Sequence, residues 1–340
     1  MRAPRQASAP LGALVLAAAI VLGALVLSLA PLVGWERQQV IAPALPARSA
    51  LTAAASVALV LALVALAVRR TRAAALPLVV ALALAVGLHA PVLVSHGLST
   101  DPVAAPGPGQ LRVLSWNTNG ALVTPDVIAR LAADQDADVV VLPQRALKDP
   151  KDRYRTAFAD AGHPMERAST PGYRIQTAVW LTPDLAPLYR YRSGPDPWKS
   201  VALLPADPDA QVDGAPLPTI VALHAPWPVG PTLSGWKRDI AWVTELCSTE
   251  VPVVVAGDFN ASIDVFGGPS LGRCVDAAHQ RDGAAVGSWP TWAPPVLSMP
   301  IDHVLSTPEA GRVVSFSVLR SEDDSGTRHR PVMAVVQRGR

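Results

Sequence analysis

The sequence is short of charged and aromatic residues. Only 16% of its 340 residues are charged and 5% are aromatic, whereas 50% are apolar. The formal net charge is only +2, so charge alone selects no class of partner, and the sequence has no basic stripe of the kind expected in a strong nucleic-acid binder. The spacing of its two cysteines, Cys247 and Cys274, does not match a cysteine-based metal site. The sequence also has no internal repeat.

The apolar residues are concentrated in three stretches near the N-terminus. These run from about Leu11 to Val33, Leu51 to Val68 and Ala73 to Val94. Each is close to the roughly 20 residues that cross the hydrocarbon core of a bilayer. A cleaved signal peptide could account for the first stretch alone, so we expect three membrane spans. Because their apolar cores contain no Asp, Glu or Lys, the spans are expected to serve as an anchor rather than a transport path.

Arginine placement predicts the orientation of these spans. Arg2 and Arg5 precede the first span, and residues 69–72 (RRTR) separate the second from the third. The positive-inside rule puts both in the cytoplasm, so everything after about Ser95 lies outside, in a multi-pass protein of the cell membrane. In that compartment Cys247 and Cys274 can form one disulfide, and two unpaired buried thiols are the alternative.

The chain divides into an anchor (residues 1–98), a Pro/Gly-rich linker (99–110) and a domain (111–340). In the domain, short apolar runs predict many strands with few intervening helices, which favours two packed sheets with helices outside. The expected helices are Pro125–Asp136 and Ser234–Glu245. The expected strands are Leu111–Trp116, Asp138–Leu142, Thr177–Leu181, Val201–Leu204, Thr219–Leu223, Val251–Ala256, Asp302–Ser306, Val313–Leu319 and Val332–Val336.

Polar residues that could belong to a functional site lie at or just after the ends of three predicted strands. The run S-W-N-T-N-G presents Asn117 and Asn119, the strand D-V-V-V-L is followed by Pro143 and Gln144, and His224 ends another strand. Strand ends and the loops after them are where α/β proteins usually place their sites. Each feature also has a structural explanation, because Asn-Gly is a common turn pair and a strand-end His can be purely structural.

Two further segments carry more specific signals. The apolar run V-V-V-A is followed by G-D-F-N, which presents Asp258 and Asn260 together. A carboxylate can orient or deprotonate water, and an amide can bind a phosphoryl oxygen. The segments I-D-H-V-L and H-R-P-V contain Asp302 and His329. A carboxylate beside an imidazole favours the charged imidazolium, which can stabilise a transferring phosphoryl group.

In this order the motifs resemble the endonuclease/exonuclease/phosphatase superfamily, from about Leu111 to Val336. The resemblance implies a DNase I-like, four-layer α/β sandwich, here preceded by three transmembrane helices. It implies metal-assisted hydrolysis of a phosphate ester, in which Asp258 activates water and Asn260 binds the scissile phosphate. It further implies that His329 stabilises the transition state, that Asp302 orients this histidine, and that His224 contacts the phosphate.

The metal and phosphate end of the site departs from the family pattern. Asn117 and Asn119 would line it, but the Glu that is the family's main metal ligand is here Gln144. The Asp that normally precedes the catalytic His is here Arg328, and Arg330 follows. A Gln carbonyl can coordinate Mg²⁺ without adding charge, and a guanidinium repels a metal but attracts phosphate. Gln144 and Asn119 are the expected ligands of Mg²⁺ or Mn²⁺, and Arg328 and Arg330 the expected substrate-binding cations.

Two interpretations of these changes stay open. In one, the arginines replace metal charge in a membrane-anchored extracytoplasmic phosphoesterase. In the other, the site binds a phosphate ligand without hydrolysing it, as a sensing module. Candidates for a substitute carboxylate are Glu309, Glu322, Asp323 and Asp324. The substrate could be nucleic acid, a phospholipid headgroup or a small phosphoester, and we expect the chain to act as a monomer.

Overall fold

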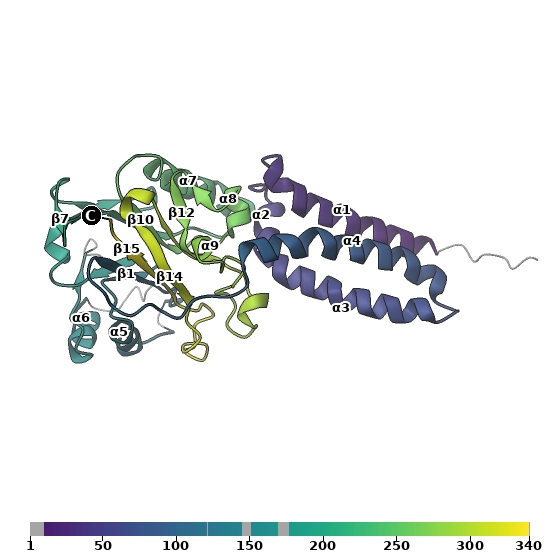
Figure 1. Ribbon diagram of the computed structural model, residues 1–340, viewed down its shortest axis with the longest axis horizontal. Coiled ribbons are helices and arrows are strands. Elements are labelled where there is room, and N and C mark those ends of the chain that lie inside the picture. Colours follow the sequence, from purple (N-terminus) through teal and green to yellow (C-terminus); the bar gives the residue numbers. More distant parts are fainter. Residues whose placement is uncertain (1–9, 121, 145–150, 169–176, 340) are drawn as a thin grey trace, which may run out of the picture.

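The computed structural model describes residues 10–120, 122–144, 151–168 and 177–339. Three long helices form a bundle at one end of the molecule, and an α/β domain lies at the other (Figure 1). The helices are α1 (Leu11–Leu29), α3 (Arg48–Ala67) and α4 (Arg72–His96). All three are long and apolar enough to cross a membrane, at the three stretches predicted from the sequence. Arg2 and Arg5 lie outside the described residues.

The connection between α1 and α3 joins the helical bundle to the domain. It contains the short helices η1 (Ala30–Leu32), α2 (Ile41–Ala44) and η2 (Leu45–Ala47). Ala42 and Leu45 are fully buried and belong to the same apolar cluster as the strands of the domain. Burial of apolar side chains is the dominant favourable term in packing two elements together. The bundle is therefore docked on the domain through a shared core.

A buried polar cluster reinforces this docking. Arg48, at the start of α3, has its Nε 3.3 Å from Oδ2 of Asp264, and its Nη1 lies 2.8 Å from Nδ1 of His89. Its Nη2 donates to the carbonyl oxygen of Leu27 at 3.1 Å. The Arg48 side chain is 4% exposed and that of Asp264 is 10% exposed. Because Asp264 follows the G-D-F-N motif closely in the chain, the cluster connects all three long helices of the bundle to the segment beyond that motif.

Replacing Arg48 by methionine is expected to destabilise the full-length protein by about 3–5 kcal/mol, because the change leaves the Asp264 carboxylate buried without its cation. The double variant Arg48→Met/Asp264→Leu should recover most of this loss, since replacing both charges by apolar groups is often neutral. Thermal unfolding in detergent measures both. Arg69→Met, at an exposed turn, is the control, and an Arg48→Met effect as small as this control would contradict the docking role.

The domain contains two main sheets, one of six strands and one of seven. The first has the order β14-β15-β1-β2-β4-β3, and the second has the order β11-β12-β13-β10-β9-β6-β5. The strands of the first sheet are β1 (Gln110–Ser115), β2 (Val139–Leu142), β3 (Glu166–Arg167), β4 (Ala178–Leu181), β14 (Arg312–Val318) and β15 (Val332–Gln337). Those of the second are β5 (Tyr189–Ser193), β6 (Ser200–Pro205), β9 (Thr219–His224), β10 (Val253–Asp258), β11 (Ser270–Leu271), β12 (Cys274–Asp276) and β13 (Asp302–Ser306).

Both faces of the first sheet are buried. Successive side chains of a strand point to opposite faces. Accordingly, Val139 and Val141 of β2 belong to the core between the sheets, whereas Val140 and Leu142 belong to a second core under the outer helices. Those helices are α5 (Pro125–Asp134) and α6 (Lys151–Asp160). The second sheet is accompanied by α7 (Leu233–Leu246), α8 (Ile263–Phe266) and α9 (Ala277–Gln280). The domain is thus the four-layer α/β sandwich that the sequence predicts.

All predicted strands and both predicted helices are present, with ends shifted by a few residues. The elements without a prediction are short or polar. They include β5, whose alternating Y-R-Y-R-S residues are half-buried or exposed, and the two-residue strands β7 (Gln211–Val212) and β8 (Ala215–Pro216). Such segments have too few apolar residues to produce a periodic signal.

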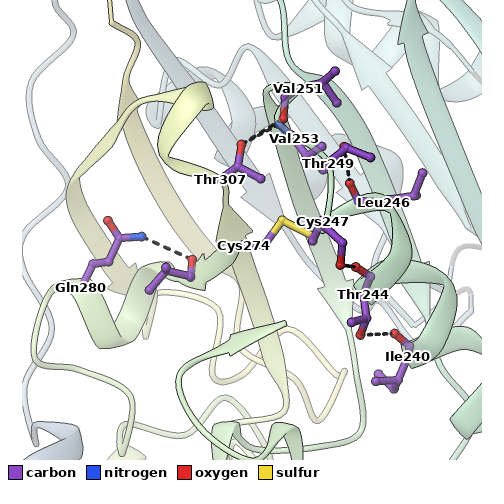
Figure 2. Close-up of a disulfide and its surroundings, with 12 residues drawn as sticks. Ile240, Thr244, Leu246, Cys247, Thr249, Val251, Val253, Cys274, Gln280 and Thr307 are labelled. Atoms are coloured by element: carbon purple, nitrogen blue, oxygen red, sulfur yellow. Dashed lines mark hydrogen bonds between the residues drawn. A yellow bond between two sulfur atoms is a disulfide. The ribbon is translucent and has the colours of Figure 1, made fainter. Parts of the chain in front are cut away.

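Cys247 and Cys274 form a disulfide, with a sulfur–sulfur distance of 2.02 Å (Figure 2). This decides between the two alternatives left open by the sequence. Cys247 caps the C-terminus of α7 and Cys274 begins β12. The bridge therefore links the outer helix to β12, next to the edge strand β11 of the second sheet, and the intervening chain contains β10. A covalent link of this kind stabilises the fold chiefly by restricting the unfolded chain.

Candidate active site

Three neighbouring strands bring the acidic and imidazole side chains together. Asp258, the last residue of β10, lies opposite His224 of the parallel strand β9 and opposite Asp302 of the antiparallel strand β13. Gly257 allows β10 and β9 to approach closely, because a Cβ there would come within 2.0 Å of the carbonyl oxygen of Leu223. The glycine of the G-D-F-N motif is thus required by the strand packing that places Asp258.

Asp258 is the centre of the cluster. It is 1% exposed, and its Oδ2 accepts a hydrogen bond from Nδ2 of Asn117 at 2.8 Å. Nε2 of His224 and Nε2 of His329 each lie 3.9 Å from the same oxygen. Burial and the nearby Asp302 carboxylate raise the pKa of Asp258 to about 6, against the opposing effects of His329 and the Asn117 amide. At neutral pH Asp258 is therefore mainly a carboxylate that accepts protons more readily than a solvent-exposed one.

His329 is held as a cation. Its Nδ1 lies 2.8 Å from Oδ2 of Asp302, and Ser288 Oγ donates to the same oxygen at 2.6 Å. Although burial acts to lower it, the Asp302 carboxylate and then Asp258 raise the pKa of His329 to about 9. The imidazolium donates through Nδ1 to Asp302, which leaves its Nε2 N–H on the side of Asp258. This arrangement confirms the expected contact between Asp302 and His329.

His224 has the opposite protonation state. Burial, followed by the positive charges of Lys199 and His329, lowers its pKa to about 4. The backbone N–H of His224 donates to the carbonyl oxygen of Lys199 at 2.9 Å, and its buried Nδ1 has no hydrogen-bond partner within the described part of the chain. Asp258 is therefore flanked by one neutral and one charged imidazole.

The three predicted asparagines of the site have different surroundings. Asn117 is 2% exposed. Its Nδ2 donates to Asp258, and its Oδ1 accepts the backbone N–H of Asn119 at 2.9 Å. These interactions position Asp258 from within the core, and a contact between Asn117 and substrate stays a prediction. Asn119 is exposed, with φ of 47°, and Asn260 is half-buried, its Nδ2 donating to the Ala225 carbonyl oxygen at 2.9 Å.

Arg330 does not belong to the site, contrary to the sequence prediction. It is 1% exposed. Its guanidinium forms an ion pair with Asp323 and donates to the carbonyl oxygens of Pro290, Thr291 and Ala293 and to Ser298 Oγ. All of its N–H groups point into this network, so it stabilises the loop that they hold. Arg328, two residues earlier, is exposed.

Two of the candidate substitute carboxylates are engaged elsewhere. Glu309 pairs with Arg273, and Asp323 pairs with Arg330. His303 of the I-D-H motif also lies away from the cluster. Its Nδ1 is 2.7 Å from Oδ2 of Asp276, and its Nε2 is 2.7 Å from the Ala261 carbonyl oxygen. His303 thus supports the backbone just after the G-D-F-N motif.

Asp258, Asp302 and His329 have their side-chain ligand atoms within 4.8 Å of one another. As an imidazolium, His329 has no free lone pair for a metal, so the residues of this group that could hold a divalent cation are Asp258 and Asp302. Oδ1 of Asp302 is buried and has no hydrogen-bond partner among the described residues. Two carboxylates suit Mg²⁺ or Mn²⁺. By contrast, Asn119 and Gln144 offer only neutral amide oxygens. The structure thus gathers anionic groups that the sequence analysis had not counted among the metal ligands, and the pair Gln144 and Asn119 stays a prediction.

Sequence reasoning missed two residues of the site. Lys199 lies next to His224 through the pairing of β6 with β9, and Ser288 donates to Asp302. Neither belongs to a motif with a recognisable spacing. The one available signal for Lys199 was its position directly before an apolar strand, which is weak evidence on its own.

Residues 114–329 match the model of the Endonuclease/Exonuclease/phosphatase family. Similar solved structures include an endonuclease/exonuclease/phosphatase from Beutenbergia cavernae, with 19% identity, a TM-score of 0.48, and coverage of 68% of this chain and 72% of that chain. An AP endonuclease from Archaeoglobus fulgidus has 12% identity, a TM-score of 0.45, and coverage of 66% and 99%. A mannosyl-6-phosphatase from Bacteroides thetaiotaomicron has 16% identity, a TM-score of 0.47, and coverage of 66% and 99%.

Among curated proteins, none matches the sequence. The family match covers well over half of the chain, and it contains every strand end that contributes to the cluster around Asp258. The chain belongs to the endonuclease/exonuclease/phosphatase family.

Proposed function

We propose that the chain is a membrane-anchored phosphoesterase that acts outside the cytoplasm. The observation that carries the proposal is the placement of the Asp258 carboxylate between the neutral His224 and the charged His329. A base for water beside a fixed cation for the phosphoryl group is the pairing that phosphate-ester hydrolysis needs.

In the proposed reaction, Asp258 accepts a proton from the attacking water. The Nε2 N–H of His329 stabilises the negative charge that develops on the phosphoryl oxygens, and Asp302 keeps this imidazolium oriented through its 2.8 Å contact. Asn260 and the exposed Arg328 bind the remaining phosphate oxygens. Each group acts from a fixed position, so little reorganisation is needed during the reaction.

A Mg²⁺ or Mn²⁺ ion is the proposed cofactor. Asp258 and Asp302 would hold it, with the amide oxygens of Asn119 and Gln144 as additional neutral ligands. Such an ion acts as a Lewis acid toward a phosphoryl oxygen. Because Gln144 brings no charge and Arg328 adds a positive one, we expect binding of the ion to be weak.

The extracytoplasmic placement is supported by two observations. The arginines at residues 69–72 lie in the turn between α3 and α4, at the end of the bundle away from the domain (Figure 1). The positive-inside rule favours a cytoplasmic position for this turn. The disulfide between Cys247 and Cys274 favours an oxidising compartment for the domain.

The test is hydrolysis of bis-p-nitrophenyl phosphate and p-nitrophenyl phosphate by the full-length protein in nanodiscs. We expect release of p-nitrophenolate that increases with added Mn²⁺ and decreases with chelator. The Asp258→Asn variant sets the background. Turnover no higher than this background would overturn the proposal, and phosphate binding that survives chelation without turnover would support the alternative, a sensing module on the same fold.

A further inference from the structure

Residues 288–299, which we term the rim loop, connect the catalytic cluster to the anchor. At its base, Ser288 Oγ donates to Oδ2 of Asp302, and the Asp302 N–H donates back to Ser288 Oγ at 3.2 Å. The N–H groups of Ser288 and Trp289 both donate to the carbonyl oxygen of Met299, which closes the loop. Both ends of the rim loop are thus fixed beside the Asp302 carboxylate, which orients His329.

The rim loop is also hydrogen-bonded to the irregular segment that contains His329. The N–H of Thr291 donates to the carbonyl oxygen of Arg328 at 3.0 Å, and the N–H of Arg330 donates to the carbonyl oxygen of Ser288 at 2.8 Å. The buried Arg330 guanidinium binds the loop from inside. The conformation of the loop is therefore coupled to the position of both members of the Asp302–His329 pair.

The tip of the rim loop lies against the anchor. Its short helix η5 (Pro295–Leu297) contacts α3, and the segment just before the loop pairs with the end of α4, where Ala284 N–H donates to the His96 carbonyl oxygen at 2.8 Å. In Figure 1 the yellow-green segment before β13 lies beside the domain-facing end of α3. The tip is thus at the level where α3 meets the domain.

The exposed side chains of the tip are apolar. Trp292 is 81% exposed, Val296 is 43% exposed and Leu297 is 37% exposed. Leu51, in the first turn of α3, is also exposed, at 46%. Tryptophan is enriched at the membrane–water interface because one part of its ring system is apolar and another is polar. The apolar tip of the rim loop lies next to the first turn of α3. The two together extend the apolar surface of the bundle that lipid would cover.

We propose that the rim loop dips into the outer leaflet at the base of the anchor, and that the substrate is a phosphate ester carried by a membrane lipid. This inference rests on the proposed function. Trp292 lies four positions after Ser288 in the chain, a span of at most about 14 Å. The site therefore lies near the layer in which lipid phosphates are found, and the docked anchor holds it there.

The reaction tested is attack of water on the phosphorus of a lipid phosphodiester, with cleavage of one P–O bond. Phosphatidyl-p-nitrophenol in phosphatidylcholine nanodiscs is a suitable probe, because its hydrolysis yields phosphatidic acid and p-nitrophenolate, and the proton lost from water passes to the buffer. Soluble bis-p-nitrophenyl phosphate has the same leaving group. Comparing the two rates isolates the contribution of the lipid.

We expect Trp292→Ser/Val296→Ser to lower the rate on the lipid probe at least about tenfold, since loss of two apolar contacts weakens engagement with the leaflet. The rate on the soluble probe should stay within about twofold. Val251→Ser is the matched control, because Val251 is similarly exposed, at 50%, and precedes β10 at the end opposite Asp258. An equal loss on both probes would overturn the inference.

A second measurement does not depend on activity. An environment-sensitive fluorophore on Val296→Cys should shift to shorter wavelength in nanodiscs and be quenched by lipid-borne quenchers, whereas the same label on Val251→Cys should not. Identical responses at the two positions would refute membrane contact. If the wild type hydrolysed neither probe, the proposed function would fail, and the labels would still report on the rim loop.

Discussion

Asp258→Asn is expected to lower kcat for phosphate-ester hydrolysis by about 10³-fold, the loss typical of removing a positioned general base. Asparagine has nearly the same shape, and it can still accept the hydrogen bond from Asn117. It cannot take a proton from water, and its neutral amide removes an anion from beside His329. The change therefore alters chemistry with little change in packing, which makes it the most direct probe of the site.

Asp138→Asn is the matched control for this prediction. Burial also raises the pKa of Asp138 to about 6, but this residue precedes β2 at the end of the first sheet away from the cluster. The same substitution there should leave kcat within about twofold of the wild type. Steady-state rates of the two variants, with folding checked by thermal unfolding, provide the comparison. Similar losses in both variants would mean that Asp258 is structural.

The cluster around Asp258 could be predicted because strand ends carry it. Asp258, His224 and Asp302 each lie at the end of an apolar run that is long enough to recognise. Once the strands pair, their register brings the three side chains together. The spacing of motifs along the chain says little by itself about distance, and it was the family resemblance that indicated which ends meet.

Side-chain direction could not be predicted in the same way. Arg328 and Arg330 are two residues apart, yet one is exposed and the other is buried against Asp323 and the rim loop. The chain between Gly326 and β15 is irregular, so no periodicity indicates which side faces inward. The same limit applies to Asn117, whose contact with Asp258 depends on the packing of two different sheets.

The docking of the helical bundle on the domain could not be predicted from the sequence either. The chain between the first two apolar stretches has no helical or strand periodicity, and it looks like an exposed connection. In the structure Ala42 and Leu45 enter the core of the domain, and Arg48 is buried against Asp264 and His89. His89 and Asp264 both lie more than 40 residues from Arg48 in the chain. Pairings over such distances leave no local pattern in the sequence.

Restoring the family's acids is the change expected to have the second largest effect. The double variant Gln144→Glu/Arg328→Asp adds two carboxylates and removes a guanidinium. It should tighten Mn²⁺ binding by about 10- to 100-fold, the size of effect that changes around metal ligands usually have. At limiting Mn²⁺ the rate of hydrolysis should rise in proportion. Titration calorimetry measures the affinity, and p-nitrophenolate release at varied Mn²⁺ measures the rate.

The control must carry the same change in charge away from the site. Gln135→Glu/Arg312→Asp meets this condition, because Gln135 caps α5 and the exposed Arg312 begins β14, at the end of that strand away from His329. If both double variants bind Mn²⁺ as the wild type does, Gln144 is not a metal ligand, and the ion is held by Asp258 and Asp302 alone. If the first variant binds Mn²⁺ tightly but hydrolyses the substrate more slowly than the wild type, Arg328 contributes to catalysis directly. The two outcomes thus distinguish a weakened metal site from one in which an arginine has taken over part of the charge.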